Sequence, residues 1–68
     1  MQRFFADEWD EFIRNCDFTD SELDVIKLLR RGWAEEDIAS ELYTSRSTIK
    51  RRKRSIVNKI KRYLLIHA

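Results

Sequence analysis

Apolar residues recur at helical spacing in four stretches of the chain, and short polar segments separate these stretches. The first stretch has apolar side chains at i, i+4, i+7 and i+8: Phe5, Trp9, Phe12 and Ile13. This is the period of one face of an α-helix. We therefore predict a first helix from about Arg3 to Asn15 and expect its aromatic stripe to lie in the core.

The second stretch opens with the pattern of a capping box and a hydrophobic staple. Thr19 and Glu22 can each bond the backbone amide of the other, and Phe18 can pack on Leu23 across the helix start. A helix over residues 20–31 follows, ended by the glycine after it. Its expected buried residues are Leu23, Ile26 and Leu29, with help from Val25 or Leu28.

A third helix is predicted over residues 35–43, because three acidic residues in its first turn suit the positive end of the helix dipole. Ala34 is a poor cap for this helix, although Trp33 can still staple onto Ile38. The residues expected to be buried are Ile38, Ala39 and Leu42.

A fourth helix opens at Ser45, a good N-cap residue, and no helix breaker follows it. About 22 residues then give a rod of roughly 33 Å. Val57 flanks its apolar stripe, which consists of Ile49, Ile56, Ile60 and Leu64.

Composition agrees with one small all-α domain, since the 68 residues include no proline and a single glycine. One cysteine, Cys16, allows no internal disulfide, and no CxxC motif or His/Cys cluster indicates a metal site. No signal peptide or membrane-spanning stretch is evident, so we expect a cytoplasmic protein without membrane contact. His67 lies at the chain end and Cys16 has no evident base, so we expect no enzyme activity, cofactor or small-molecule ligand.

Charge is distributed unevenly along the chain. Residues 1–44 hold all 12 acidic side chains against 5 basic ones, whereas residues 45–68 hold 9 basic and no acidic side chains. The net charge of +2 therefore hides a division into −7 and +9. Such asymmetry indicates a polyanionic partner for the basic end, nucleic acid first and an anionic membrane surface second.

The third and fourth helices have the features of a helix-turn-helix. Only residues 43–45 join them, and Ala39 provides the small side chain needed where two helices cross closely. The apolar contacts between the two helices would come from Ile38, Leu42 and Ile49. The first turns of the last helix would direct donor-rich side chains outward, toward bases or phosphates. These side chains are Arg46, Ser47, Lys50, Arg51 and Arg54.

Residues 18–60 resemble the LuxR/GerE-type helix-turn-helix domain. The matching positions are Phe18-Thr19, Glu22, Gly32, Asp37-Ile38-Ala39, Leu42, Ser45, Thr48-Ile49-Lys50 and Lys59-Ile60. The resemblance implies a sequence-specific transcription regulator that reads double-stranded DNA in the major groove. It also implies base contacts by Lys50, Arg51 and Arg54. The implied phosphate contacts are Ser45, Arg46, Thr48 and Lys59, to which the outward Ser47 is added.

The chain departs from this family at Ala34, Tyr43 and Arg52, where capping Ser or Thr, glycine and histidine are common. Residues 1–17 would form an extra front helix, and residues 61–68 would extend the last one. A front helix and a long basic last helix also resemble region 4 of bacterial sigma factors, which reads promoter DNA together with RNA polymerase. Both relationships stay open.

A different class of function, a helical protein-protein interaction module, has weaker support because Lys53 interrupts the seven-residue apolar spacing. Specific operators are usually read by dimers, so we expect a homodimer on DNA. The candidate interface is the apolar tail, which could equally pack on the first helix. Its residues are Tyr63, Leu64, Leu65 and Ile66.

Overall fold

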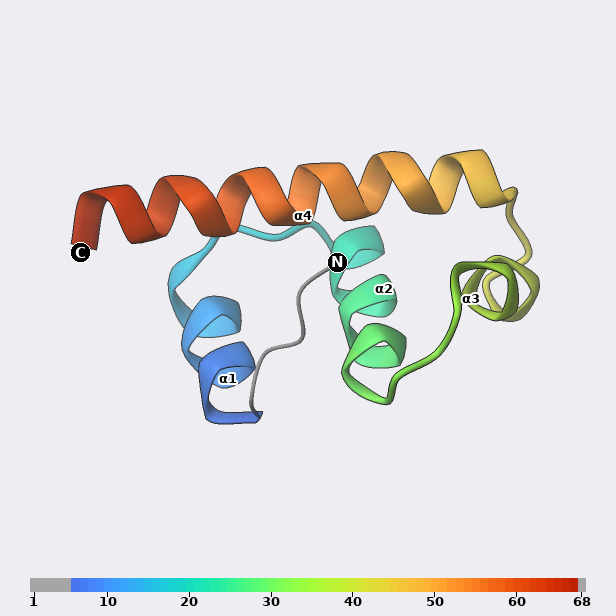
Figure 1. The fold of residues 1–68 in the computed structure, drawn as a ribbon, viewed down its shortest axis with the longest axis horizontal. Coiled ribbons are helices and arrows are strands. Elements are labelled where there is room, and N and C mark those ends of the chain that lie inside the picture. The colour runs from blue at the N-terminus through green and yellow to red at the C-terminus, as the bar shows by residue number, and fades with distance from the viewer. Residues whose placement is uncertain (1–5, 68) are drawn as a thin grey trace.

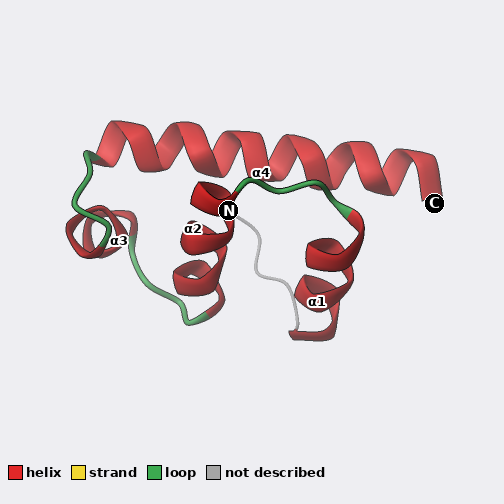
Figure 2. Cartoon of the chain, turned by 180° about the vertical axis from the view of Figure 1, so that it is seen from behind, coloured by secondary structure: helices red, strands yellow, loops and turns green. Residues whose placement is uncertain are grey.

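The computed structural model describes residues 6–67, which form four α-helices and no strand. The helices are α1 (Ala6–Asn15), α2 (Asp20–Arg30), α3 (Glu35–Glu41) and α4 (Arg46–His67). α4 runs along the long axis of a molecule measuring 35 × 19 × 19 Å, and the other three helices lie along one side of it (Figures 1 and 2). The predicted all-α, four-helix fold is therefore confirmed. The predicted helix start near Arg3 and the predicted core residue Phe5 lie outside the described residues.

The core lies between α4 and the three shorter helices. Its buried apolar residues are Trp9, Phe12, Val25, Ile26, Leu28, Ile38, Ala39, Ile49, Ile56 and Ile60. Ile38 and Ala39 are buried as predicted, but Leu42 is only half-buried. Most of the apolar positions predicted for α4 are confirmed, but Leu64 is exposed because the end of α4 extends past α1 (Figure 1).

The predicted buried face of α2 was wrong in part. Leu23 and Leu29 are only half-buried, whereas Val25 and Leu28 are buried together with Ile26. α2 packs against α1, α3 and α4, so its contacts extend around more of the helix than a single stripe. The spacing of apolar residues in α2 does not show which of them face these three neighbours.

Local signals at the helix starts behave as predicted. Thr19 is the N-cap of α2: its Oγ1 accepts from the Glu22 amide at 3.1 Å, and its own amide donates to Glu22 Oε1 at 2.9 Å. Ser45 caps α4, since its Oγ accepts from the Thr48 amide at 3.2 Å. Ala34 precedes α3 and makes no side-chain cap.

α3 ends two residues earlier than predicted, at Glu41. Tyr43 has a φ of 54°, in the left-handed region, and the Thr44 amide donates to the Ala39 carbonyl at 2.9 Å. These features form a Schellman-type helix end, with tyrosine where glycine is usual. The turn at Tyr43 redirects the chain so that α4 starts directly from Ser45.

Aromatic side chains join α1 to the last turns of α4. Phe12 packs edge-on against Trp9 and Tyr63, with ring centroids 6.3 and 6.1 Å apart. The Tyr63 hydroxyl also donates to Glu11 Oε2 at 2.8 Å. Tyr63 thus belongs to the fold of its own chain, whereas the following residues, Leu64, Leu65 and Ile66, are exposed.

Candidate nucleic-acid interface

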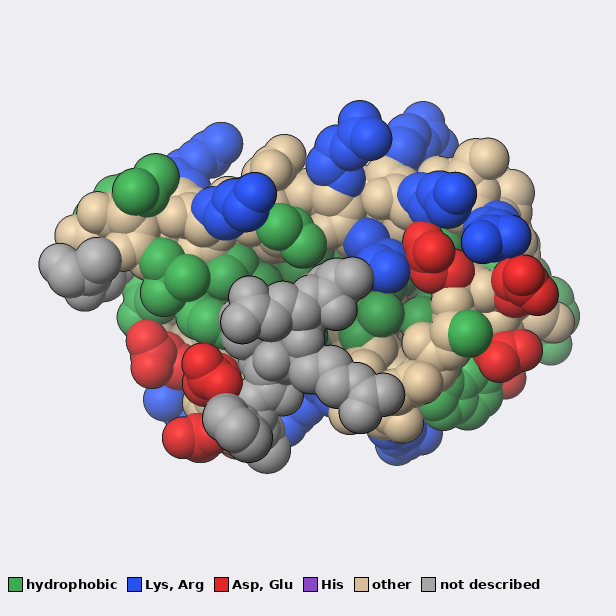
Figure 3. All heavy atoms as spheres, in the orientation of Figure 1, with side chains coloured by type: hydrophobic (Ala, Val, Ile, Leu, Met, Phe, Trp, Pro, Cys, Tyr) green, Lys and Arg blue, Asp and Glu red, His purple; other side chains and the backbone are tan. Residues whose placement is uncertain are grey.

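The helical period divides the surface of α4 into a buried side, an outward face and two flanks. The outward face is defined here by five exposed residues spaced four and three apart: Ser47, Arg51, Arg54, Asn58 and Lys61. Lys and Arg side chains gather along this edge of the molecule in Figure 3. No helix of residues 6–67 covers it, because α1, α2 and α3 all lie on the other side of α4 (Figure 1).

One flank of α4 faces α3 and is largely neutralised. Arg46 pairs with Glu36 at 3.3 Å, and Lys53 pairs with Glu35 at 3.7 Å. The Arg46–Glu36 pair is exposed on both sides, so it contributes at most about 1 kcal/mol and can be exchanged for another anion. Arg46 therefore keeps the capacity for the phosphate contact that the sequence predicts.

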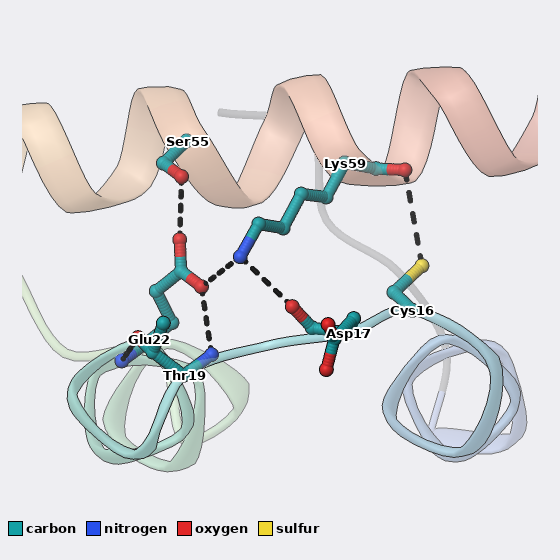
Figure 4. A network of polar contacts seen from close by, with 6 residues as sticks. All are labelled: Cys16, Asp17, Thr19, Glu22, Ser55 and Lys59. Atoms are coloured by element: carbon teal, nitrogen blue, oxygen red, sulfur yellow. Dashed lines mark hydrogen bonds and ion pairs between the residues drawn. The ribbon is translucent and has the colours of Figure 1, made fainter.

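The other flank faces the start of α2 and carries Thr48, Arg52, Ser55 and Lys59. Here the Lys59 ammonium donates to Glu22 Oε1 at 2.5 Å and to the Asp17 carbonyl at 2.9 Å, and Ser55 donates to Glu22 Oε2 (Figure 4). Lys59 also lies 5.9 Å from the centroid of the Phe18 ring. This network fixes the capping box of α2 to the middle of α4.

Glu22 is an acidic residue buried at only 5% exposure. Burial alone would raise the pKa of its carboxyl group, but the hydrogen bonds from Lys59, Ser55 and the Thr19 amide outweigh burial and lower the pKa to about 2. Glu22 is thus ionised and fully bonded. The Lys59 ammonium bonds Glu22 and the Asp17 carbonyl and so stabilises the fold. The phosphate contact expected of Lys59 stays a prediction, and Lys59 is not included in the proposed interface.

Three of the nine basic residues of α4 are paired with carboxylates in residues 6–67, which leaves six without an ion pair. These six are Lys50, Arg51, Arg52, Arg54, Lys61 and Arg62. α4 contains no acidic residue. The surface of α4 therefore holds uncompensated positive charge over most of its length.

The predicted base-contacting residues are all exposed on this surface. Arg51 and Arg54 lie on the outward face, and Lys50 lies next to it on the side of α3. Among the predicted phosphate contacts, Ser47 lies in the first turn of the outward face. The hydroxyls of Ser45 and Thr48 bond each other at 2.9 Å.

Sequence reasoning missed Asn58, Lys61 and Arg52. Asn58 and Lys61 continue the outward face four and seven residues after Arg54, so the same helical spacing could have identified them. An asparagine amide can form a bidentate hydrogen-bond pair with N6 and N7 of adenine, which makes Asn58 a candidate base contact. Helical spacing could not have identified Arg52, because its importance depends on residues of α2, such as Ser21, that lie beside it only in the folded chain.

None of the helices in residues 6–67 is long and apolar enough to cross a membrane. Over the same residues, no cluster of His, Cys, Asp and Glu side chains is arranged to hold a metal ion. Cys16 is half-buried against the Lys59 carbonyl, and burial raises the pKa of its thiol although the Lys59 charge opposes this.

Comparison of the chain with known proteins found no matching family model, no matching curated protein and no matching solved structure.

Proposed function

We propose that this chain binds double-stranded DNA sequence-specifically and regulates transcription in the cytoplasm. α3 and α4 would act as a helix-turn-helix in which the outward face of α4 enters the major groove. A helix with its side chains is about 10–12 Å wide and the major groove is about 12 Å wide, so the dimensions match. No cofactor is required for this activity.

The observation that carries the proposal is the outward face itself. Arg51, Arg54 and Lys61 are exposed, share one side of α4 and form no ion pair within residues 6–67. Unpaired cations along one helix face repel each other, so a polyanion that brings phosphates to them gains favourable charge interactions and releases its counterions. Asn58 adds an amide group that can distinguish base edges.

The proposal divides the interface into two roles. Lys50, Arg51 and Arg54 would read base edges, because they are exposed in the first half of α4. Arg46 and the hydroxyl residues of the first turn, Ser45, Ser47 and Thr48, would hold phosphates and fix the register. The exposed tail residues Leu64, Leu65 and Ile66 would form a homodimer interface, so that two copies bind two half-sites.

Fluorescence anisotropy of the chain with a pool of random duplexes, over a series of salt concentrations, tests the proposal. Affinity should fall with salt at a log-log slope of about 0.9 for each phosphate contact, and sequencing of the bound fraction should show an enriched motif. Absence of binding at low salt would contradict the proposal.

A matched pair of double variants separates the interface from net charge. Arg51→Ala with Arg54→Ala removes two cations from the outward face. Lys27→Ala with Arg31→Ala removes two exposed cations from α2 and its C-cap. The first pair should abolish the enriched motif, and the second should leave it unchanged. Equal effects of the two pairs would indicate nonspecific charge attraction only.

A second candidate function is a module that acts with RNA polymerase, as the resemblance to sigma region 4 suggests. Its support is the position of the acidic side chains of α1, which lie on the side of the molecule away from the basic edge of α4, whereas those of α3 lie next to that edge (Figure 3). Such a chain would bind DNA only when polymerase is present. Adding purified polymerase to the anisotropy experiment distinguishes the two functions.

A further inference from the structure

A pocket of about 260 Å³ lies next to the outward face, between the first turn of α2 and the middle of α4. Hydroxyl and guanidinium groups line much of it. Ser21 comes from α2, and Thr48, Arg51 and Arg52 come from α4. Arg51 belongs both to this pocket and to the outward face, so the pocket borders the surface proposed to enter the groove.

Arg52 is the unusual residue of this pocket. Its side chain is half-buried, yet it makes no hydrogen bond or ion pair within residues 6–67. The Glu22 carboxylate also lines the pocket but forms no ion pair with Arg52, because Lys59, Ser55 and the Thr19 amide already bond its oxygens. A cation that is partly removed from water without a partner is unfavourable, so the site favours an incoming anion.

The chemistry of the lining indicates which anion fits. A guanidinium group donates in a planar fork that matches the oxygens of a phosphate group, and a hydroxyl such as that of Ser21 supplies a further donor. The Ser21 side chain is exposed and makes no hydrogen bond within the described part of the chain. Both donors are therefore available to a ligand.

The two flanks of α4 differ in this respect. On the side of α3, the carboxylates of Glu35 and Glu36 occupy Lys53 and Arg46. On the side of α2, Arg52 has no such partner. A DNA backbone on the α2 side of α4 would therefore meet a half-buried guanidinium without a carboxylate partner, whereas on the α3 side only the exposed Lys50 lacks one.

We propose that Arg52 and Ser21 together bind one backbone phosphate of the DNA strand that runs along the α2 side of α4. The inference rests on the proposed DNA-binding function and extends it, since it makes α2 part of the interface. It also predicts that the two DNA strands bordering the groove are held unequally, with the tighter phosphate contact on the α2 side.

The first test compares Arg52→Gln with Arg31→Gln, which removes the same charge at the far end of α2. Arg52→Gln should weaken binding to every sequence by about tenfold, the size of one charge-assisted hydrogen bond. It should also lower the salt slope by about 0.9 and leave the enriched motif unchanged. Arg31→Gln should change neither the affinity nor the salt slope.

The second test places a negative charge at the pocket with Ser21→Glu and, as its control, on exposed α3 with Ser40→Glu. Acidic residues are favourable in the first turn of a helix, so Ser21→Glu should melt at the temperature of the parent or above it. It should nevertheless bind DNA at least tenfold more weakly than Ser40→Glu, because a carboxylate beside Arg52 competes with the phosphate.

Single neutral methylphosphonate linkages along the bound duplex then locate the phosphate. A methylphosphonate at the phosphate bound by Arg52 should weaken DNA binding by the parent but should weaken binding by Arg52→Gln no further. This is the result expected when the two changes remove the same contact. If the parent binds DNA but Arg52→Gln and Ser21→Glu keep the affinity and salt slope of their controls, the inference is overturned and the proposed function stands. A parent that binds no duplex would overturn both.

Discussion

The Lys59 ammonium lies 2.5 Å from Oε1 of Glu22, a residue 37 positions earlier in the chain. Glu22 also closes the capping box of α2, so one carboxylate joins a local helix cap to a long-range contact with α4. The proposed phosphate pocket lies beside this contact. The position of α2 against α4 therefore depends on Glu22 remaining ionised.

Acid should destabilise the protein through Glu22. Its pKa is about 2 in the folded state, below its ordinary value of 4.5, so the unfolded state takes up the proton first as pH falls. This contribution, on the order of 3 kcal/mol, is full above about pH 4.5 and is lost as pH falls toward 2. Urea unfolding between pH 7 and pH 2 measures it. Glu22→Gln should lack this part of the pH dependence, and an identical pH profile in this variant would contradict the assignment.

Lys59→Met should lower the free energy of unfolding by about 3 kcal/mol, because it leaves the buried Glu22 charge without its cation. Burial would then raise the pKa of Glu22, so acid unfolding should move to higher pH. Lys61→Met provides the control, since Lys61 is exposed on the outward face and forms no ion pair within residues 6–67. Equal stabilities of the two variants would show that the Glu22–Lys59 contact does not support the fold.

Tyr43→Gly should stabilise the protein by about 1 kcal/mol. Tyr43 has a left-handed φ of 54°, which is unfavourable for residues with a Cβ, and its side chain is 97% exposed, so little packing is lost. Thermal or urea unfolding measures the change. Ser40→Gly, within α3, should instead destabilise the protein by about 0.5–1 kcal/mol. A loss of stability in Tyr43→Gly would mean that the tyrosine ring contributes more to the fold than its exposure indicates.

Replacing Lys50, Arg51 or Arg54 by alanine should cost about 1–3 kcal/mol of binding free energy on the enriched site, and should relax base preference at one position each. Asn58→Ala should behave in the same way at an adenine. Arg46→Ala should weaken all sequences alike, because its proposed partner is a phosphate. Anisotropy with the enriched duplex and single-base variants of it distinguishes these patterns. The assignment of α4 as the recognition helix fails if the Lys50 and Arg51 variants bind every duplex as the parent does.

The exposed tail should mediate self-association on DNA. Leu65 and Ile66 are 83% and 70% exposed, so replacing both by glutamine should change the folding free energy by no more than about 0.5 kcal/mol. Sedimentation with the enriched duplex should show a dimer for the parent and a monomer for the double variant. Tyr43→Gly removes an exposed aromatic ring elsewhere and should remain dimeric. Strictly monomeric behaviour of the parent, both free and on DNA, would remove the dimer from the proposal.

Features set by neighbours in the chain could be predicted from the sequence. The Thr19–Glu22 capping box and the Ser45 cap need only residues three positions apart, and the number and order of the helices follow from apolar spacing. The outward face is also local, since helical geometry alone places Arg51 and Arg54 on one side of α4.

Tertiary structure decided what depends on contacts between distant segments. Only the packing of α2 against three helices shows that Val25 and Leu28 are both buried while Leu23 and Leu29 are half-buried. The end of α3 at Glu41 likewise became visible only with the turn into α4. Lys59 could be recognised as the partner of Glu22, and Arg52 as a neighbour of Ser21, only once α2 lay against α4. The charge of α4 was thus determined by its sequence, but which of its cations remain free for a ligand was determined by the carboxylates that folding brings to the others.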